Sequence, residues 1–185
     1  MISVECGGNL LDLKAGDKVL LNGTVFTARD KAHRFLAENN FDKIKNSVIY
    51  HCGPIVKDNG AIAAGPTTSS RLNFYTPKII EKYGIKAIIG KGGMDGSVIN
   101  AMRGKCIYFS AIGGLGVLYA DSIRVKGVYK PEFGMTEAIW EFEVKDFPLV
   151  VAIDSRGKNI YEDIYNKSKA VFQKQVTANP EQLQK

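Results

Sequence analysis

The chain has 185 residues, of which 45% are hydrophobic and 24% are charged, and its formal net charge is +6. This composition is typical of a globular protein with a core and argues against a disordered or fibrous chain. No apolar run reaches the roughly 20 residues that span a bilayer, and residues 1–6 lack the pattern of a signal peptide, so we expect a cytoplasmic protein. The lysines are scattered without an RNA-binding aromatic motif, which disfavours nucleic-acid binding.

The first predicted elements are two strands and a helix. Lys18–Leu21 and Gly23–Ala28 have the pattern of strands on either side of an Asn22-Gly23 turn. A helix is expected to begin near Asp30, which is a good N-cap residue. Ser47–Cys52 is the next predicted strand, and the Gly-Pro pair that follows would end it.

The rest of the chain continues to alternate strands with helices. Helices are predicted directly after Arg71, ending at Tyr83-Gly84, and at Ser97–Met102. The further predicted strands are Ala61–Ala64, Ala87–Ile89, Cys106–Phe109, Ile123–Val128, Ala138–Val144 and Leu149–Ile153. This repetition favours an α/β domain with a mixed, partly parallel sheet. We expect one domain over residues 1–165 and a polar C-terminal helix or tail over residues 166–185 that could dock on a partner.

The cysteines and histidines give no sign of a metal centre. The chain has three cysteines, far apart in the sequence, and two histidines. An odd number without a C-x-x-C pair argues against a disulfide framework and against a zinc site, and two histidines do not make a self-contained metal site. We therefore expect Cys6, Cys52 and Cys106 to be small buried hydrophobic residues, and we predict no metal ligand in this chain.

The segment Gly65–Arg71, with the sequence GPTTSSR, concentrates four hydroxyl side chains and one arginine in a single turn. A helix N-terminus offers free N–H groups and a positive dipole end, so such a turn suits an anion. The same serines and threonines also suit a plain helix N-cap. Both interpretations remain open from this segment alone.

Three predicted loops each carry one cation after a strand: Arg29, Arg71 and Lys91. In an α/β sheet such loops gather beyond the carboxyl ends of the strands, where ligands bind, and three converging cations would suit a dicarboxylate. Taken separately, Arg29 could pair with Asp30 or Glu38, Arg71 could lie along its helix, and Lys91 could be solvated. The repetition of the pattern in three loops favours the binding site.

Two further motifs have competing interpretations. Gly90–Ser97 is similar to nucleotide-binding loops but fails in detail, because Asp95 replaces the last glycine of G-x-G-x-x-G and Gly92 replaces the Ser or Thr of a Walker A loop. His33 follows Asp30 by three residues, so both share one helix face. That pair could serve acid–base chemistry or could simply orient the helix.

In several motifs the chain resembles the β subunit, or C-terminal domain, of class I iron–sulfur fumarate hydratases and the related L-tartrate dehydratases. The resemblance covers nearly the whole chain in the expected order. The matching stretches are Thr27–His33, His51–Pro54, Gly65–Arg71, Gly90–Met94, Glu137–Trp140 and Asp146–Pro148.

The resemblance implies a swivelling β/β/α domain and the reversible hydration of fumarate to (S)-malate, a reaction of the tricarboxylic acid cycle. It also implies a [4Fe-4S] cluster that is bound by a partner α subunit and not by this chain, in an obligate pair expected as α2β2. One alternative is a β subunit that helps to dehydrate L-tartrate to oxaloacetate. Another is a non-catalytic swivelling module that binds an anion or a partner.

The resemblance also implies roles for individual residues. Four of them would bind the substrate: Arg29, Thr68, Arg71 and Lys91. Thr67 would be the catalytic threonine, which moves the proton on the carbon next to the hydroxyl-bearing one. A free hydroxyl is a very weak base, so Thr67 would need an activating group, and that group could lie on the partner. Asp30 and His33 would support Arg29 from behind.

Overall fold

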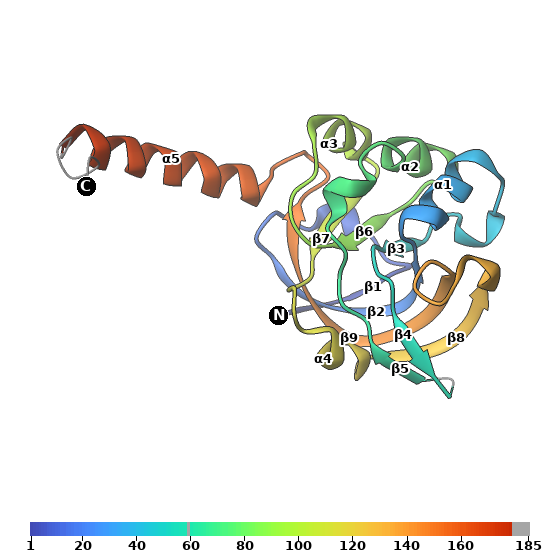
Figure 1. Ribbon diagram of the computed structural model, residues 1–185. Coiled ribbons are helices and arrows are strands. Elements are labelled where there is room, and N and C mark those ends of the chain that lie inside the picture. Colours follow the sequence, from blue (N-terminus) through green and yellow to red (C-terminus); the bar gives the residue numbers. More distant parts are fainter. Residues whose placement is uncertain (59, 179–185) are drawn as a thin grey trace.

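The computed structural model describes residues 1–58 and 60–178, and Figure 1 shows their path. Within these residues, seven strands form one sheet and two strands form a separate small sheet. The strands of the large sheet are β1 (Ile2–Glu5), β2 (Lys18–Thr27), β3 (Val48–Tyr50), β6 (Ala87–Gly90), β7 (Ile107–Ser110), β8 (Ile123–Tyr129) and β9 (Ile139–Ile153). The small sheet pairs β4 (Ile55–Lys57) with β5 (Gly60–Ala63).

The large sheet has the strand order β1-β2-β3-β6-β7-β9-β8. The first five strands in this order run parallel, whereas β9 is antiparallel to β2, β7 and β8. Because β9 pairs with both β2 and β7, the strands β2, β3, β6, β7 and β9 close into a ring. The structure is a mixed α/β fold, and the predicted mixed, partly parallel sheet is confirmed.

The α-helices of the described residues are α1 (Asp30–Glu38), α2 (Thr76–Tyr83), α3 (Gly96–Met102), α4 (Gly116–Ala120) and α5 (Ile160–Ala178). The first three cover one side of the ring. Short 3-10 turns are η1 (Leu10–Asp12), η2 (Asp42–Ile44), η3 (Ser69–Leu72) and η4 (Pro131–Phe133). Figure 1 shows α1, α2 and α3 side by side along the sheet and α5 extending away from the body. Among the described residues, no helix combines the length and the apolar character needed to cross a membrane.

Apolar side chains on both faces of the ring strands form two clusters. One cluster gathers residues from all five ring strands, such as Val25, Ile89 and Phe142, and fills the inside of the ring. The other joins outward-facing residues such as Ile49 and Ile88 to α1, α2 and α3. Burial on both faces explains why β3 and β6 read as continuous apolar runs, as parallel strands under helices usually do.

The predicted Asn22-Gly23 turn is wrong. Residues 18–27 form one strand, β2, which pairs with β9 on both sides of Asn22. The pairing register shifts between Leu21 and Gly23, and the backbone N–H of Asp146 in β9 donates to Asn22 Oδ1 at 2.9 Å. The turn signal therefore marks a β-bulge. The predicted strands 138–144 and 149–153 are likewise two parts of β9, which continues through this bulge.

Helix boundaries differ from the predictions at three places. Arg71 itself lies in the 3-10 turn η3, and α2 begins only at Thr76, although it ends at the predicted Tyr83-Gly84 pair. Helix α1 has Arg29 as its N-cap, so Asp30 is its first residue rather than its cap. Helix α5 begins at Ile160. Residues 179–185, the end of the predicted C-terminal tail, lie outside the described residues.

Candidate functional site

Three of the predicted loops meet at one edge of the sheet. Strands β2, β3 and β6 are adjacent and parallel, so the residues that follow their carboxyl ends lie at the same edge. Arg29 follows β2, His51 follows β3, and Lys91 follows β6. The predicted loops that carry Arg29 and Lys91 gather at this edge because their strands are parallel. The loop that carries Arg71 follows β5 of the small sheet instead, and it reaches the same edge through the bridges Cys52–Pro66 and Thr68–Lys91. We use the name carboxyl edge for this edge of the sheet and for the loops there that carry Arg29, His51, Thr67–Arg71 and Lys91.

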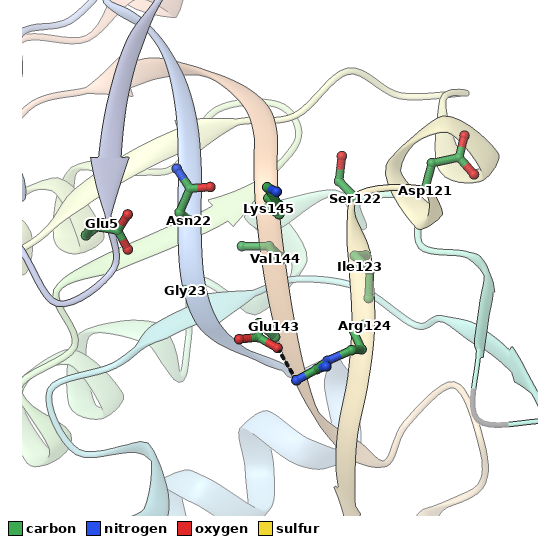
Figure 2. Close-up of a pocket in the computed structure, with 10 residues that line it drawn as sticks. All are labelled: Glu5, Asn22, Gly23, Asp121, Ser122, Ile123, Arg124, Glu143, Val144 and Lys145. Atoms are coloured by element: carbon green, nitrogen blue, oxygen red, sulfur yellow. Dashed lines mark ion pairs between the residues drawn. The ribbon is translucent and has the colours of Figure 1, made fainter.

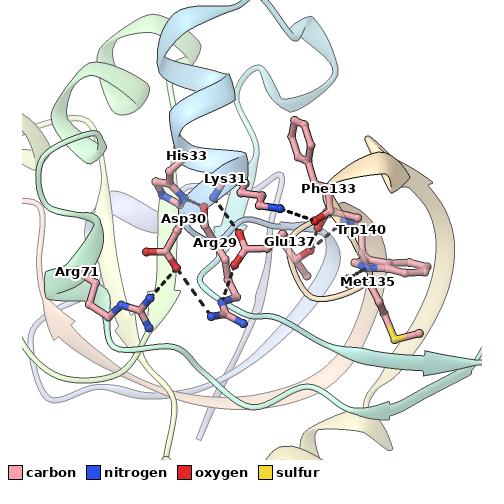
Figure 3. A network of polar contacts seen from close by, with 11 residues as sticks. Arg29, Asp30, Lys31, His33, Arg71, Phe133, Met135, Glu137 and Trp140 are labelled. Carbon is pink, nitrogen blue, oxygen red and sulfur yellow. Dashed lines mark hydrogen bonds and ion pairs between the residues drawn. The ribbon is translucent and has the colours of Figure 1, made fainter.

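Arg71 and Arg29 converge on one carboxylate at the carboxyl edge. Asp30 Oδ2 lies 2.8 Å from Arg71 Nη2 and 3.8 Å from Arg29 Nη2. Glu137, in the loop before β9, places Oε1 3.5 Å from Arg29 Nε and accepts the backbone N–H of Lys31 at 2.8 Å. Figure 3 shows both guanidinium groups turned toward Asp30, with Glu137 on the other side of Arg29. The two arginines therefore form one charged network rather than separate surface residues.

The alternative interpretations of these arginines are correct only in part. Arg29 pairs with Asp30, as the alternative proposed, but its second partner is Glu137, and Glu38 pairs with Arg34 instead. Arg71 does not lie along a helix, because it reaches across to Asp30 on α1.

The two arginines differ in their exposure. The side chain of Arg29 is 25% exposed and that of Arg71 is 53% exposed. A Cβ atom at Gly53 would lie 2.5 Å from Arg29 Cδ, so a glycine is required where the Arg29 side chain crosses the loop after β3. Arg29 is held in place by its surroundings, whereas about half of the Arg71 side chain faces solvent.

The segment containing Thr67 and Thr68 is joined to Lys91 through the backbone. The N–H of Thr67 donates to the His51 carbonyl at 2.6 Å, and the N–H of Lys91 donates to the Thr67 carbonyl at 3.3 Å. Thr68 and Lys91 also form an isolated parallel bridge, and the N–H of Ser69 donates to the Lys91 carbonyl at 3.0 Å. Thr67, Thr68 and Lys91 are half-buried neighbours at the carboxyl edge. The GPTTSSR segment is thus strand-like as far as Thr68 and then enters the 3-10 turn η3, whose N-cap Thr68 makes no side-chain capping hydrogen bond.

His33 is buried directly behind Arg29. Its Nδ1 atom lies 3.0 Å from the Arg29 carbonyl oxygen, which can only accept, so Nδ1 carries a proton. Burial lowers the pKa of His33 to about 4, and the imidazole is therefore neutral near pH 7. A neutral, 1% exposed side chain bonded to the backbone is placed to hold Arg29. This position agrees with the supporting location implied by the resemblance, and the functional role stays a prediction.

Several residues of the carboxyl edge were not singled out from the sequence. Glu137 and His51 lie in stretches that carry the family resemblance, and that is the only signal that marks them. Ser69 lies in the GPTTSSR segment, where it was one hydroxyl among four. Each of the three contacts the network through a partner far away in the chain, so local pattern could not select them.

The cysteines are buried singly, as expected. All three are free thiols with exposures between 0% and 7%. Burial raises the pKa of Cys6 to about 12 and also raises the pKa of Cys52 and of Cys106. Within the described part of the chain, His, Cys, Asp and Glu side chains form no group of three that could hold a metal ion. These thiols therefore do not fit the ligand set of an iron–sulfur cluster.

A hollow at a different place carries none of the predicted site residues. Figure 2 shows this cavity of about 630 Å³, whose charged side chains come from β1, β8, β9 and the residues before β8. Its central ion pair joins Arg124 Nη2 to Glu143 Oε2 at 2.7 Å. These two residues are directly paired across β8 and β9, which makes the ion pair an ordinary cross-strand contact.

Comparisons with known proteins place this geometry in context. Residues 4–164 match the family model described as Fumarase C-terminus. The chain is 43% identical over 165 residues to a putative fumarate hydratase class I of Geobacillus stearothermophilus, with 85% of this chain and 32% of the relative covered. It is 44% identical over 170 residues to a putative L(+)-tartrate dehydratase subunit beta of Methanocaldococcus jannaschii, with 84% and 87% covered.

A third relative gives a similar result. The chain is 36% identical over 163 residues to the L(+)-tartrate dehydratase subunit beta of Escherichia coli, with 82% of this chain and 81% of the relative covered. The chain thus spans about a third of the Geobacillus protein but more than four fifths of the two beta subunits.

Proposed function

The chain belongs to the Fumarase C-terminus family, and we propose that it is the β subunit of a hydro-lyase that reversibly hydrates fumarate to (S)-malate. The carboxyl edge carries this proposal. It brings Arg29, Arg71, Lys91 and Thr67 together although they lie on three separate loops. Cations and hydroxyl groups on neighbouring loops suit a substrate with two carboxylates.

We assign the two kinds of side chain different tasks. Arg71, Arg29 and Lys91, with Thr68 beside them, bind the carboxylates, because guanidinium groups form paired hydrogen bonds with such groups and lysine adds a point charge. Thr67 moves the proton on the carbon next to the hydroxyl-bearing one. His51 contacts Thr67 through its backbone carbonyl while its imidazole faces Ser69. We therefore place the base that activates Thr67 on a partner chain.

The partner in this proposal is an α subunit that holds a [4Fe-4S] cluster, in an α2β2 assembly. Two observations support a partner: two relatives of similar length are named as beta subunits, and the Geobacillus relative is about three times as long as the matched region. The buried thiols of this chain do not fit a cluster, which agrees with its location elsewhere. We derive no step of the reaction from the cluster itself.

A second candidate is the dehydration of L-tartrate to oxaloacetate. The observation that favours it is that two of the relatives described above are named L(+)-tartrate dehydratase subunit beta, and the chain covers most of each. Tartrate carries one more hydroxyl group than malate, so the two reactions can share one dicarboxylate clamp.

The test is an assay of the chain with and without a cluster-bearing partner, prepared without oxygen. We expect the chain alone to be inactive and the complex to convert fumarate and malate faster than tartrate. Faster turnover of tartrate would favour the second candidate. Full fumarate hydration by the isolated chain without iron would contradict the proposed division of labour. A complex that keeps its activity after Arg71→Ala and Lys91→Ala would show that this domain is a non-catalytic binding module.

A further inference from the structure

Three polar side chains are buried beneath the loops of the carboxyl edge. His51, Ser69 and Tyr108 are each 0% exposed. Ser69 Oγ lies 2.9 Å from His51 Nδ1 and 2.9 Å from the Tyr108 hydroxyl, and the Tyr108 hydroxyl lies 2.9 Å from the Gly92 carbonyl oxygen. The chain of contacts therefore runs from the end of β3, through η3 and β7, to the loop that carries Lys91.

The direction of the protons along this chain follows from its far end. The Gly92 carbonyl can only accept, so the single proton of Tyr108 is donated there. Ser69 must then donate to the Tyr108 oxygen, and His51 must donate from Nδ1 to Ser69 Oγ. This is the one assignment in which each of the three contacts has a proton of its own.

The surroundings of His51 agree with this assignment. Its Nε2 atom is buried and has no hydrogen-bond partner among the described residues. A neutral imidazole protonated on Nδ1 leaves only a lone pair there, whereas a charged imidazole would bury an unpaired N–H, which costs more. Burial and the nearby His33 ring both lower the pKa of His51 well below its usual value. Burial also raises the pKa of Tyr108, so its hydroxyl keeps its proton.

The backbone at Gly90 is shaped to admit the Ser69 hydroxyl. A Cβ atom at Gly90 would overlap Ser69 Oγ and would lie 3.1 Å from the Tyr108 hydroxyl and 3.3 Å from His51 Nδ1. Because any larger residue would displace the hydroxyl, the last residue of β6 and the three side chains form one fitted unit.

The same residues also contact the proposed catalytic loops through their backbones. The His51 carbonyl accepts the N–H of Thr67, and the N–H of Ser69 donates to the carbonyl of Lys91. Gly92, which accepts from Tyr108, is the neighbour of Lys91 in the chain. A shift of the buried side chains would therefore move Thr67 and Lys91 relative to one another.

We propose that His51, Ser69 and Tyr108 are positioning residues that set the placement of Thr67 relative to Lys91 in the active site. The catalytic part of this inference depends on the proposed function, whereas the coupling of the two loops does not. The three side chains do not touch the substrate; they act through the loops that they join. We therefore expect loss of the Tyr108 hydroxyl to lower kcat much more than loss of a buried hydroxyl outside this group.

A matched pair of variants tests this prediction. Tyr108→Phe removes the hydroxyl that bonds Ser69 and the Gly92 carbonyl. Tyr83→Phe removes a buried hydroxyl that bonds the carbonyls of Leu36 and Asn39 instead. In the complex with its partner, we expect Tyr108→Phe to lower kcat about 10- to 100-fold with KM changed less than about threefold, since small misplacements of reacting groups cost factors of this size. We expect Tyr83→Phe to keep the wild-type kcat within about twofold. Equal kcat values for the two variants would overturn the proposal.

Substitutions of His51 separate positioning from general support of the fold. The side-chain amide that His51→Asn introduces can place an N–H near the position of Nδ1, whereas the side chain in His51→Leu cannot donate. We expect His51→Asn to retain most of the activity and His51→Leu to lose it as Tyr108→Phe does. If both fold and both retain full activity, His51 has no positioning role.

Amide hydrogen exchange in the isolated full chain tests the coupling without any enzymatic assay. In Tyr108→Phe and Ser69→Ala, we expect the amides of Thr67, Ser69 and Lys91 to exchange at least about tenfold faster, while Tyr83→Phe leaves them unchanged. Unchanged exchange in both folded variants would refute the coupling of the two loops. If the wild-type complex showed no hydro-lyase activity but this exchange pattern held, the proposed function would fail and the coupling would stand.

Discussion

Two charged regions of this chain differ in what holds their side chains. At the carboxyl edge, Arg71 extends from the 3-10 turn η3 and Arg29 from the N-cap of α1, and the two meet at Asp30. Buried hydrogen bonds hold these loops from below. At the cavity of Figure 2, Arg124 and Glu143 extend from directly paired positions of two regular strands. The pleated sheet alone explains the second arrangement, because opposite charges at facing positions are a common cross-strand pair.

The two regions also differ in how strictly the backbone constrains their side chains. The cavity near β8 is a clear hollow, yet its central ion pair is exposed, and such pairs contribute only about 0–1 kcal/mol. The carboxyl edge requires glycine at positions 53 and 90, where the chain passes close to other side chains. Glycine loses more conformational freedom on folding than any other residue, so each of these positions costs stability. We infer from this cost that the side chains packed against the two glycines, Arg29 and Ser69, have a function.

The largest expected effect is that of Thr67→Ala at the carboxyl edge. Loss of a proton-transfer group costs about 10²- to 10⁴-fold in rate, so kcat of the complex should fall by that factor while the complex stays folded. Steady-state assays and thermal unfolding measure both quantities. Thr24→Ala, at an exposed position of β2, is the control and should match the wild type. A wild-type rate for Thr67→Ala would remove this residue from the mechanism.

Two buried histidines, His33 and His51, lie beneath the carboxyl edge, so we expect the stability of the chain to depend on pH. The cavity of Figure 2 adds no such dependence on histidine, because no histidine lines that cavity. The pKa of His33 is about 4 in the folded chain and 6.5 for an ordinary histidine. Between these values the unfolded chain binds the proton and the folded chain does not, so stability is lost as pH falls from about 6.5 to 4. The loss should reach roughly 3 kcal/mol at most, and His51 adds to it in the same direction.

Urea denaturation of the isolated chain at several pH values between 7.5 and 4.5 measures this loss. His33→Asn can keep a hydrogen bond to the Arg29 carbonyl without a titrating group, and its stability should fall less steeply in this range. The carboxylates contribute equally to both proteins and cancel in the comparison. Identical slopes for the variant and the wild type would show that His33 titrates normally.

The smallest effects come from a pair of arginines matched in exposure and ion pairing. Arg71 pairs with Asp30 at 2.8 Å and is 53% exposed, and Arg124 pairs with Glu143 at 2.7 Å and is 69% exposed. Arg71→Ala should raise KM for the dicarboxylate about 10- to 100-fold, as expected for a lost hydrogen bond to a charged group. Arg124→Ala should change kcat and KM less than about twofold. Similar values of KM for both variants would contradict the assignment of the carboxyl edge as the substrate site.

Much of the secondary structure follows from local signals. The apolar run Ala87–Ile89 predicted β6, and the pair Tyr83-Gly84 predicted the end of α2, because burial and glycine conformation act on neighbouring residues. The bulge at Asn22 was mistaken for a turn because the preference of Asn-Gly is local, whereas the pairing with β9 involves residues more than 100 positions away. Tertiary pairing outweighed the local preference.

The candidate site, like the secondary structure, depends partly on local sequence and partly on tertiary contacts. The amino-acid sequence by itself determined which side chains carry charge and hydroxyl groups, and that Arg29 and Lys91 follow apolar strands. Only the tertiary structure decided that Asp30 joins Arg71 to Arg29, that Glu137 is the second partner of Arg29, and that a buried imidazole and two hydroxyls lie beneath Thr67. The physical reason is that strand order and register set these contacts between distant segments, and no spacing along the chain records them.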